Sequence, residues 1–331
     1  MAQPRFDVLG IGNAIVDVII QTDDGFLSEN NLLKGAMSLV DAETSAALYD
    51  KSGPAIEISG GSAGNTISCL ASLGSNAAYV GKVFDDQLGH VFAHDIRSLG
   101  VHFATTPATE GPPTATCLVL VTKDAERTMQ TFLGACVGLG PQDIDEDEIA
   151  AAAVTYMEGY LWDPEEAKAA FLKAADCAHA AGREVSLSLS DPFCVDRHRD
   201  EFRDLVANHV DILFANEDEI ISLYQTNTFD EALQAVRGAC KVAALTRGEN
   251  GSVIVSGDEV HSVDAEPVDN VIDTTGAGDA YAAGFLHGYT AGQGFAVSAR
   301  TGSICAAEMI SHLGARAQVN LKDLVAEKIS S

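Results

Sequence analysis

Basic residues are scarce in this sequence. Its 331 residues include 20 Lys and Arg but 48 Asp and Glu, so the formal net charge at pH 7 is −28. A surface with this charge repels the phosphates of nucleic acids and of anionic lipids over about one Debye length, ~10 Å. We therefore expect neither a nucleic acid nor a membrane as a partner. Any nucleotide that binds here must meet groups that offset the acidic field locally.

Paired cysteines, a leader segment and long apolar runs are also missing. The seven cysteines are widely spaced and form no Cys-x-x-Cys pair, which predicts reduced thiols rather than a zinc site or a redox pair. No charged-then-apolar leader precedes the first strand-like segment. No apolar stretch approaches the roughly 20 residues that span a bilayer. These features predict a soluble protein of the cytoplasm.

Three nucleotide-binding signatures are absent as well. No Gly-x-x-x-x-Gly-Lys-Ser/Thr loop occurs, and the combination of His-Arg-Asp and Asp-Phe-Gly motifs that marks protein kinases is not present. In GIGNAIVD (10–17), Ile15 occupies the place of the third glycine of a dinucleotide-binding fingerprint. A P-loop enzyme, a protein kinase and a dinucleotide-binding protein are therefore disfavoured.

The chain does contain an alternation of short β-branched runs and Ala/Leu-rich amphipathic stretches. This alternation predicts an α/β fold with a mostly parallel sheet, in which nearly continuous apolar strands are covered by helices on both faces. The strand-like runs are 6–12, 77–83, 154–160, 184–190, 210–216 and 242–248.

Two regions break the alternation. Segments 16–22 and 36–40, and then 101–106, 116–122 and 128–133, have strand character without helices between them. The polar residues from Lys123 to Glu126 fit the turn of a hairpin. We therefore predict a single α/β domain over residues 1–331, with a small β-sheet lid built from about 14–40 and 101–135. A lid over a cleft can exclude water.

The strongest functional signal is DTTGAGDAYAAGF (273–285). Its turn of Gly276, Ala277 and Gly278 opens an Ala-rich helix from about Asp279, and the N-terminus of a helix presents unpaired backbone N–H groups. Such donors stabilise a transferring phosphoryl group, while an adjacent carboxylate can accept the proton of an attacking hydroxyl. The alternative is a tight turn with Asp279 as an N-cap. The thirteen residues together favour an anion hole with Asp279 as a base.

Together with ISGGSAGNTISCLASLG (58–74), this segment resembles the paired signatures of the PfkB, or ribokinase, family of carbohydrate and nucleoside kinases. The resemblance extends over nearly the whole chain. It implies a three-layer α/β/α fold, a monomer or homodimer, and transfer of the γ-phosphoryl group of ATP to an alcohol of a small molecule. It also implies that Asp279 is the catalytic base and that Gly276, Ala277 and Gly278 form the anion hole.

The resemblance further indicates where the accepting molecule binds. Family members approach the sugar with a glycine pair and hold its hydroxyls with an asparagine and an aspartate. The corresponding residues here are Asn13, Asp17, Gly60, Gly61 and Asn65. The simpler interpretation of the glycine pair is a turn in which Ser62 caps a helix over 63–73, and both interpretations can hold.

The nucleotide and metal ligands also follow from the resemblance. Asn216 and Glu219 match an Asn-x-x-Glu motif that organises a hydrated Mg²⁺, although the same pair fits a helix capping box. Thr246 and Gly248 would lie against the ATP phosphates, as would Asn216, Thr275 and Gly278. Asp273 and Thr275 would hold a monovalent cation such as K⁺.

Within the family, the chain is most similar to adenosine kinase-like members. The similarity lies in GNAIVD, residues 116–136, SLSDPF (188–193) and VDILFANE (210–217). It implies that Arg127 in the lid reaches the transferring phosphate. It implies as acceptor the 5′-hydroxyl of a purine nucleoside such as adenosine, whose base contacts Ile15, Met37, Leu133 and Phe193. Those four could equally be core residues.

Two other functions remain open from the sequence. A sugar kinase acting on ribose, fructose or a keto-sugar acid would use the same Asp17, Asn65 and Asp279 without an apolar wall. A regulator that only binds its ligand would not need the base, the anion hole and the metal motif together, and all three are present.

Overall fold

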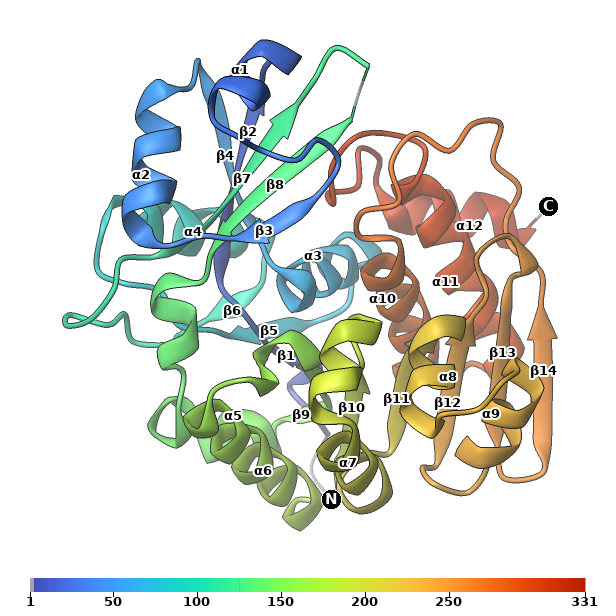
Figure 1. Ribbon diagram of the computed structural model, residues 1–331. Coiled ribbons are helices and arrows are strands. Elements are labelled where there is room, and N and C mark those ends of the chain that lie inside the picture. Colours follow the sequence, from blue (N-terminus) through green and yellow to red (C-terminus); the bar gives the residue numbers. More distant parts are fainter. Residues whose placement is uncertain (1–2, 125, 331) are drawn as a thin grey trace.

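The structure is a computed structural model that describes residues 3–124 and 126–330 (Figure 1). Ala125, in the predicted hairpin turn, lies outside the described residues. A nine-stranded sheet forms what we call the body, with the strand order β14-β13-β12-β11-β10-β9-β1-β5-β6. The strands from β12 to β6 run parallel, and β13 and β14 are antiparallel at one edge. The bounds are β1 (Phe6–Ile11), β5 (Ala77–Val80), β6 (His102–Phe103), β9 (Ala152–Glu158), β10 (Glu184–Ser188), β11 (Ile212–Asn216), β12 (Val242–Thr246), β13 (Ser252–Ser256) and β14 (Glu259–Val263).

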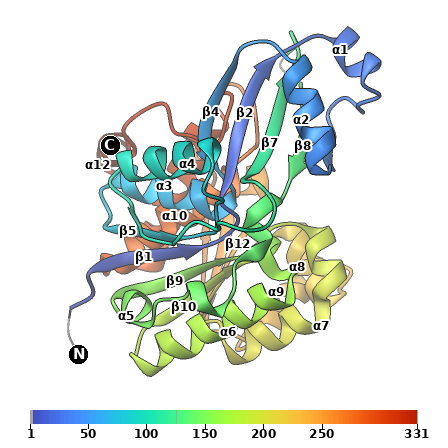
Figure 2. The same ribbon diagram turned by 90° about the vertical axis from the view of Figure 1, so that its left-hand side faces the viewer.

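Helices cover both faces of this sheet, as Figure 2 shows for α3 and α10 on one face and α5 and α6 on the other. Successive residues of a strand point to opposite cores: Ile212 and Phe214 of β11 pack on the α10 side, and Leu213 packs on the α6 side. One face carries α3 (Ser62–Leu73), α4 (Gln87–Ser98), α10 (Ala277–Thr290), α11 (Phe295–Met309) and α12 (Leu321–Ser330). The other carries α5 (Glu146–Ala150), α6 (Glu165–Ala180), α7 (Pro192–Asn208), α8 (Glu217–Tyr224) and α9 (Phe229–Val236).

A second sheet forms the lid, in the order β3-β8-β7-β2-β4. Its outer face packs on two helices through Leu27, Leu48 and Leu118, and its inner face presents Cys117 and Val119 toward the body. Its strands are β2 (Ile15–Gln21), β3 (Met37–Leu39), β4 (Ala55–Gly60), β7 (Ala115–Val121) and β8 (Arg127–Phe132), and its helices are α1 (Asp24–Glu29) and α2 (Ala42–Lys51). Short 3-10 helices cover Gly134–Gly138, Pro141–Asp143, Gly159–Trp162 and Gly248–Asn250.

The strands of the lid differ from the prediction at two places. Segment 101–106 was expected in the small sheet, but β6 pairs with β5 at the edge of the body. The reason is Phe103, whose ring packs on Tyr79 and Phe92 in the main core. Conversely β4, which was not assigned to the lid, pairs antiparallel with β2. The glycine pair therefore follows a lid strand directly and connects the lid to α3.

Two smaller expectations concern the cysteines and the membrane. All seven cysteines are free thiols, and five of them are buried. Among the helices that the structure describes, none combines the length and the apolar character needed to cross a membrane.

Candidate active site

A cavity of about 710 Å³ lies between the lid and the body. It opens at the carboxyl ends of the parallel strands, where ligands bind in α/β sheets. The strand ends that border it contribute Asn13, Glu158, Ser188, Asn216 and Thr246. Sixteen residues predicted from sequence line it: Asn13, Ile15, Asp17, Met37, Gly61, Asn65, Arg127, Leu133, Phe193, Asn216, Glu219, Thr246, Thr275, Gly276, Gly278 and Asp279. Gly60, Gly248, Asp273 and Ala277 are not among its lining residues.

Asp279 is the third residue of α10, which begins at Ala277, two residues before the predicted start. Its Oδ1 accepts a hydrogen bond of 2.6 Å from Ser62 Oγ, and its Oδ2 accepts one of 3.0 Å from Asn65 Nδ2. Burial raises the pKa of Asp279 from its ordinary 3.8 to about 6, against these hydrogen bonds and the charge of Arg316. At neutral pH the carboxylate is ionised but binds a proton more readily than an exposed Asp, as a general base requires.

Ser62 differs from the prediction. The N-cap of α3 is Gly61, which has no side chain to cap the helix, and Ser62 is the first helical residue. The Ser62 hydroxyl donates to Asp279 instead of to its own helix. The N-terminus of α3 is therefore joined to the N-terminus of α10 at the candidate base.

The turn before α10 depends on Gly276. Its backbone is left-handed, with φ of 77°, and an added Cβ would lie 2.8 Å from Ala315 Cβ. Only glycine avoids both the strain and the clash. Ala277 N donates to the Thr274 carbonyl at 3.2 Å, so it is already engaged. The donors left for an anion are those of the next residues in the first helical turn, Gly278 and Asp279.

The glycine pair makes room for the site's own groups. An added Cβ at Gly60 would lie 2.4 Å from Asp17 Oδ2, and one at Gly61 would lie 2.1 Å from the Asn13 carbonyl oxygen. The side chain of Asp17 makes no hydrogen bond or ion pair with any described residue, and it faces the cavity. Burial raises its pKa to about 6, while Arg316 and Arg127 lower it. An unpartnered carboxylate at this place can accept hydrogen bonds from a ligand.

Glu158 is a buried carboxylate of the site that the motifs did not indicate. Its Oε1 accepts a hydrogen bond of 2.7 Å from Asn13 Nδ2, and its Oε2 accepts one of 2.7 Å from Ala63 N at the start of α3. Burial raises its pKa to about 7. The side chain of Asn13 is thus bound to Glu158. The one available signal was an acidic residue at the end of an otherwise apolar strand.

Arg127 and Asp273 form an ion pair between the lid and the body. Arg127 Nη1 lies 2.7 Å from Asp273 Oδ2, and both side chains are about nine-tenths buried. Asp273 also accepts hydrogen bonds of 3.0 Å from the backbone N–H groups of Thr275 and Gly314. The carboxylate predicted to hold a cation is therefore bound to protein donors, and the arginine predicted to contact phosphate is held beside the anion hole.

Asn216 and Glu219 form a helix capping box, which was the alternative interpretation of their Asn-x-x-Glu motif. Asn216 N and Nδ2 donate to the two oxygens of Glu219 at 2.8 and 2.7 Å, and Glu219 N donates to Asn216 Oδ1 at 2.9 Å. Burial raises the pKa of Glu219 to about 7. Both residues line the cavity beside Thr246, whereas Gly248 begins a 3-10 turn behind it.

The apolar part of the cavity comes mainly from the lid. Ile15, Met37 and Leu133 line it together with Phe193, in the first turn of α7, and none of the four is fully buried. Phe193 is 77% exposed and Met37 is 51% exposed. Further apolar lining residues that sequence reasoning did not single out are Ile19, Leu39, Ile58, Val119, Met129 and Tyr160.

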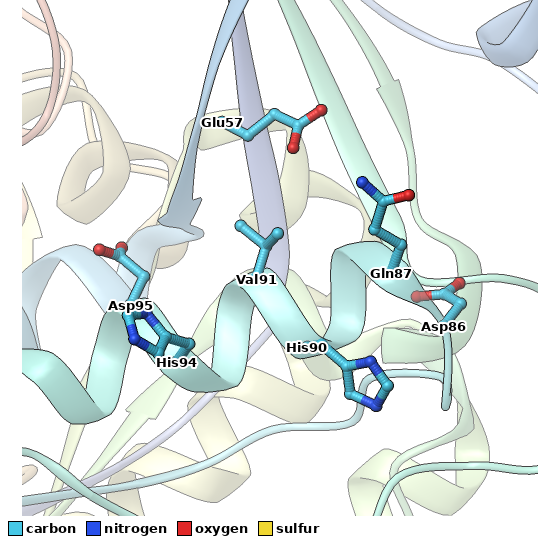
Figure 3. Close-up of a pocket in the computed structure, with 7 residues that line it drawn as sticks. All are labelled: Glu57, Asp86, Gln87, His90, Val91, His94 and Asp95. Carbon is cyan, nitrogen blue, oxygen red and sulfur yellow. The ribbon is translucent and has the colours of Figure 1, made fainter.

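A second, shallow hollow of about 630 Å³ lies on the outer side of α4 (Figure 3). It contains none of the predicted site residues. His90 and His94 lie one helical turn apart there, but the described residues contain no group of three or more His, Cys, Asp or Glu side chains that could hold a metal ion. The cavity under the lid is therefore the candidate active site.

Comparison with known proteins agrees with this geometry. Residues 56–322 match the model of the pfkB family carbohydrate kinases, and the chain belongs to this family. The adenosine kinase from Sinorhizobium meliloti is 52% identical, with a TM-score of 0.89 over 99% of this chain and 100% of that one. A probable sugar kinase from Rhizobium etli CFN 42 is 51% identical, with a TM-score of 0.91 over 98% and 99%. The ATP-dependent ribose-1-phosphate kinase of Halopiger xanaduensis is 33% identical over 69% of this chain and 72% of the relative.

These findings confirm the predicted fold, a mixed α/β architecture with a large, mostly parallel sheet and a smaller sheet. They also confirm the predicted class of enzyme. The protein is an ATP-dependent nucleoside or carbohydrate kinase.

Proposed function

We propose that the protein transfers the γ-phosphoryl group of ATP to the 5′-hydroxyl of a purine nucleoside such as adenosine, with Asp279 as the base. The observation that supports this most is the composition of the cavity, in which the Asp17 and Asp279 carboxylates, among other acidic groups, lie under a largely aliphatic lid. A sugar alone needs no such apolar wall. The adenosine kinase from Sinorhizobium meliloti, at 52% identity over 99% of this chain, supports the same acceptor.

The nucleoside binds in two parts. The Asp17 carboxylate, which has no hydrogen-bond partner among the described residues, accepts hydrogen bonds from the two vicinal ribose hydroxyls, and Asn65 assists it. The purine base contacts Ile15, Met37 and Leu133 under the lid and Phe193 opposite them. Burial of the exposed Phe193 and Met37 against the base would favour closure of the lid and exclusion of water.

ATP binds on the other side of Asp279. Thr246 and Asn216 lie at the strand ends where its phosphates fit, Gly248 lies in the turn that follows Thr246, and the N–H groups of Gly278 and Asp279 face the γ-phosphoryl group. Asn216 and Glu219 would hold Mg²⁺ through water, because both oxygens of Glu219 already accept one hydrogen bond each but retain free lone pairs. When bound, Mg²⁺ neutralises phosphate charge. Asp273 and Thr275 would hold K⁺ in exchange for the Arg127 contact.

Phosphoryl transfer then proceeds in line. Asp279 accepts the proton of the 5′-hydroxyl as that oxygen bonds to the γ-phosphorus, and the bond from this phosphorus to the β,γ-bridging oxygen breaks. The products are ADP and the nucleoside monophosphate, and the proton passes from Asp279 to solvent. Arg127 and the helix N-terminus stabilise the charge on the transferring group. All the residues assigned to the reaction come from one chain.

A sugar kinase is the second candidate. The probable sugar kinase from Rhizobium etli is as similar to this chain as the adenosine kinase is. Asp17, Asn65 and Asp279 would serve a ribose or fructose hydroxyl in the same way.

The acceptor is tested by measuring kcat/KM for adenosine, guanosine, ribose, fructose and ribose 1-phosphate under identical conditions. We expect adenosine to exceed both free sugars by at least about 100-fold, since loss of the base removes its apolar contacts. A preference for a sugar would overturn the nucleoside assignment. In the same assay Asp279→Asn should lower kcat by about 10²–10⁴-fold, as loss of a general base does, with unchanged affinity for ATP. Near-normal turnover of this variant would refute the role of Asp279.

A further inference from the structure

The loop between α11 and α12, residues 310–320, contacts the site at three places although no motif pointed to it. Gly314 N donates to Asp273 Oδ2 at 3.0 Å, and Ala315 packs against Gly276 at the anion hole. The side chain of the next residue, Arg316, extends to α3 and to the lid strand β4. This loop therefore joins the phosphate side of the cavity to the acceptor side.

The guanidinium of Arg316 lies between Asn65 and Ser59. Nη1 donates to Asn65 Oδ1, and Nη2 donates to the carbonyl oxygen of Ser59 and, at 3.0 Å, to its hydroxyl. A guanidinium has only donors, so it can face only the oxygen of the Asn65 amide. The NH₂ group of that amide must then point the other way, where it donates to Asp279 Oδ2 at 3.0 Å.

We propose that Arg316 is a positioning residue for phosphoryl transfer: it fixes the orientation of the Asn65 amide and, through it, the place and charge of the Asp279 carboxylate. The inference rests on the proposed role of Asp279 as the base. Without Arg316 the Asn65 amide can turn over, and its oxygen would then face a carboxylate oxygen, which repels it.

The other end of this network is anchored on the outer helix α4. Ser59 N and Oγ both donate to Asp95 Oδ2, at 2.8 and 2.6 Å. Figure 3 shows Asp95 on α4. Hydrogen bonds thus connect Asp95, Ser59, Arg316, Asn65 and Asp279 in order. Because Ser59 belongs to the lid strand that precedes the glycine pair, the network couples the edge of the lid to the base.

The positive charge of Arg316, like its hydrogen bonds, favours the ionised carboxylate of Asp279. Ser62 and Asn65 of α3 donate to Asp279, and Arg316 is the cation whose charge lowers the pKa of this carboxyl. The other charged groups that face the cavity are acidic or already paired. They are Asp17 from β2, Glu158 from β9, Glu219 from α8, Asp191 just before α7, Asp163 paired with Arg197 of α7, and Arg127, bound to Asp273. Removing the Arg316 charge should therefore raise the pKa of Asp279 further above its ordinary value.

The test compares Arg316→Gln, Arg316→Lys and a control, Arg300→Gln. Arg300, on α11, is bound to Glu266 and lies outside the cavity lining. For each enzyme, kcat is measured across about pH 5.5 to 9 with saturating ATP and the acceptor that the parent enzyme uses best. In Arg316→Gln the acidic limb should move to higher pH, so that a rise of about one pKa unit lowers kcat about fivefold near pH 6, and kcat recovers above pH 8. Arg316→Lys, which keeps the charge, should restore the acidic limb but not the full kcat. Arg300→Gln should match the parent.

Three results would count against the proposal. An unchanged pH profile in Arg316→Gln, or a loss of kcat that is uniform with pH and accompanied by a lower melting temperature, would leave Arg316 with a merely structural role. An acidic limb in Arg316→Lys that stays displaced would show that the charge is not what matters. If the parent enzyme prefers a sugar, the proposed acceptor fails while the comparison of profiles still decides the role of Arg316. If Asp279→Asn is active, the base assignment fails first.

Discussion

At the scale of single residues, the site concentrates buried carboxylates with few cations beside them. Burial raises the pKa of Asp17 and Asp279 to about 6 and that of Glu158 and Glu219 to about 7. Each such group is easier to ionise in the unfolded chain than in the folded one, so each costs stability once the pH exceeds its ordinary pKa. The protein therefore retains these acids at the expense of stability, as groups needed for binding and proton transfer would be retained.

Asp17→Asn tests this cost. The folded pKa of about 6 lies above the ordinary 3.8, so the destabilisation by Asp17 is absent below about pH 4, grows between pH 4 and 6, and is complete above pH 6. The variant should be more stable than the parent by about 1–3 kcal/mol near pH 7.5, allowing for partial access to solvent, and equal to it near pH 4. Urea denaturation at both pH values measures the difference. The Asp17→Asn substitution should also raise the KM for the acceptor and leave the KM for ATP unchanged. Equal stability at both pH values would contradict the argument.

At the scale of elements, the site is built where two helix N-termini meet. Helices α3 and α10 both follow a glycine with positive φ, Gly61 at 83° and Gly276 at 77°, and neither has a side-chain cap. Both helices bring the partial positive charge of their first turn to the cavity. The acidic composition requires local positive charge to hold a bound phosphate. Backbone N–H groups at these helix N-termini supply part of that charge, and the few arginines supply the rest.

Gly61→Ala tests whether the entry into α3 depends on this glycine. The alanine would have to adopt the left-handed backbone of Gly61, and its Cβ would lie 2.1 Å from the Asn13 carbonyl oxygen. The start of α3, with Ser62 and Asn65, must therefore move. We expect the free energy of unfolding to fall by about 2–4 kcal/mol and most of the activity to be lost.

Gly100→Ala is the matched control for this substitution. Gly100 has a similar φ of 87° but nothing within 4 Å of an added Cβ. It should cost about 1 kcal/mol and leave kcat intact. Thermal denaturation and initial rates of both variants decide the matter. Equal effects of the two substitutions would mean that backbone strain, and not the contact with Asn13, sets the cost.

At the scale of the whole molecule, the alternation of apolar runs was sufficient to predict the parallel sheet and its helices. The periodicities of apolar residues that are typical of strands and of helices are both local properties of the chain. Membership of the lid was harder. β4 ends at the first glycine of the pair, where the sequence indicates a turn, and β6 has the same apolar character as a lid strand but pairs elsewhere.

Contacts between distant parts of the chain could not be predicted. The Asn13 to Glu158 hydrogen bond joins residues 145 apart, and the Arg316 to Asn65 bond joins residues 251 apart. No local pattern in the sequence indicates such pairings, so Glu158 and Arg316 both lay outside every motif. The residues that local geometry does determine, such as the glycines before α3 and α10, were found because a tight turn requires them.

The net charge of −28 leads to a last prediction, about the binding of ATP. A molecule with this charge repels an anionic nucleotide at long range, and the helix N-termini attract it only at short range. Salt screens the long-range repulsion more than the short-range contacts. Raising the ionic strength from about 20 to about 200 mM should therefore lower the KM for ATP by roughly two- to fivefold, opposite to the usual behaviour of nucleotide sites lined with lysine.

Adenosine, which is uncharged, provides the internal control, since its KM should change little over the same range. The ionic strength is varied with tetramethylammonium chloride at fixed K⁺ and Mg²⁺, so that occupancy of the proposed cation sites stays constant. Association rates from stopped-flow measurements should rise with salt in parallel. A KM for ATP that increases with salt would mean that Arg127 and the positive ends of α3 and α10 dominate the field at the mouth of the cavity, and that the acidic surface is too distant to matter.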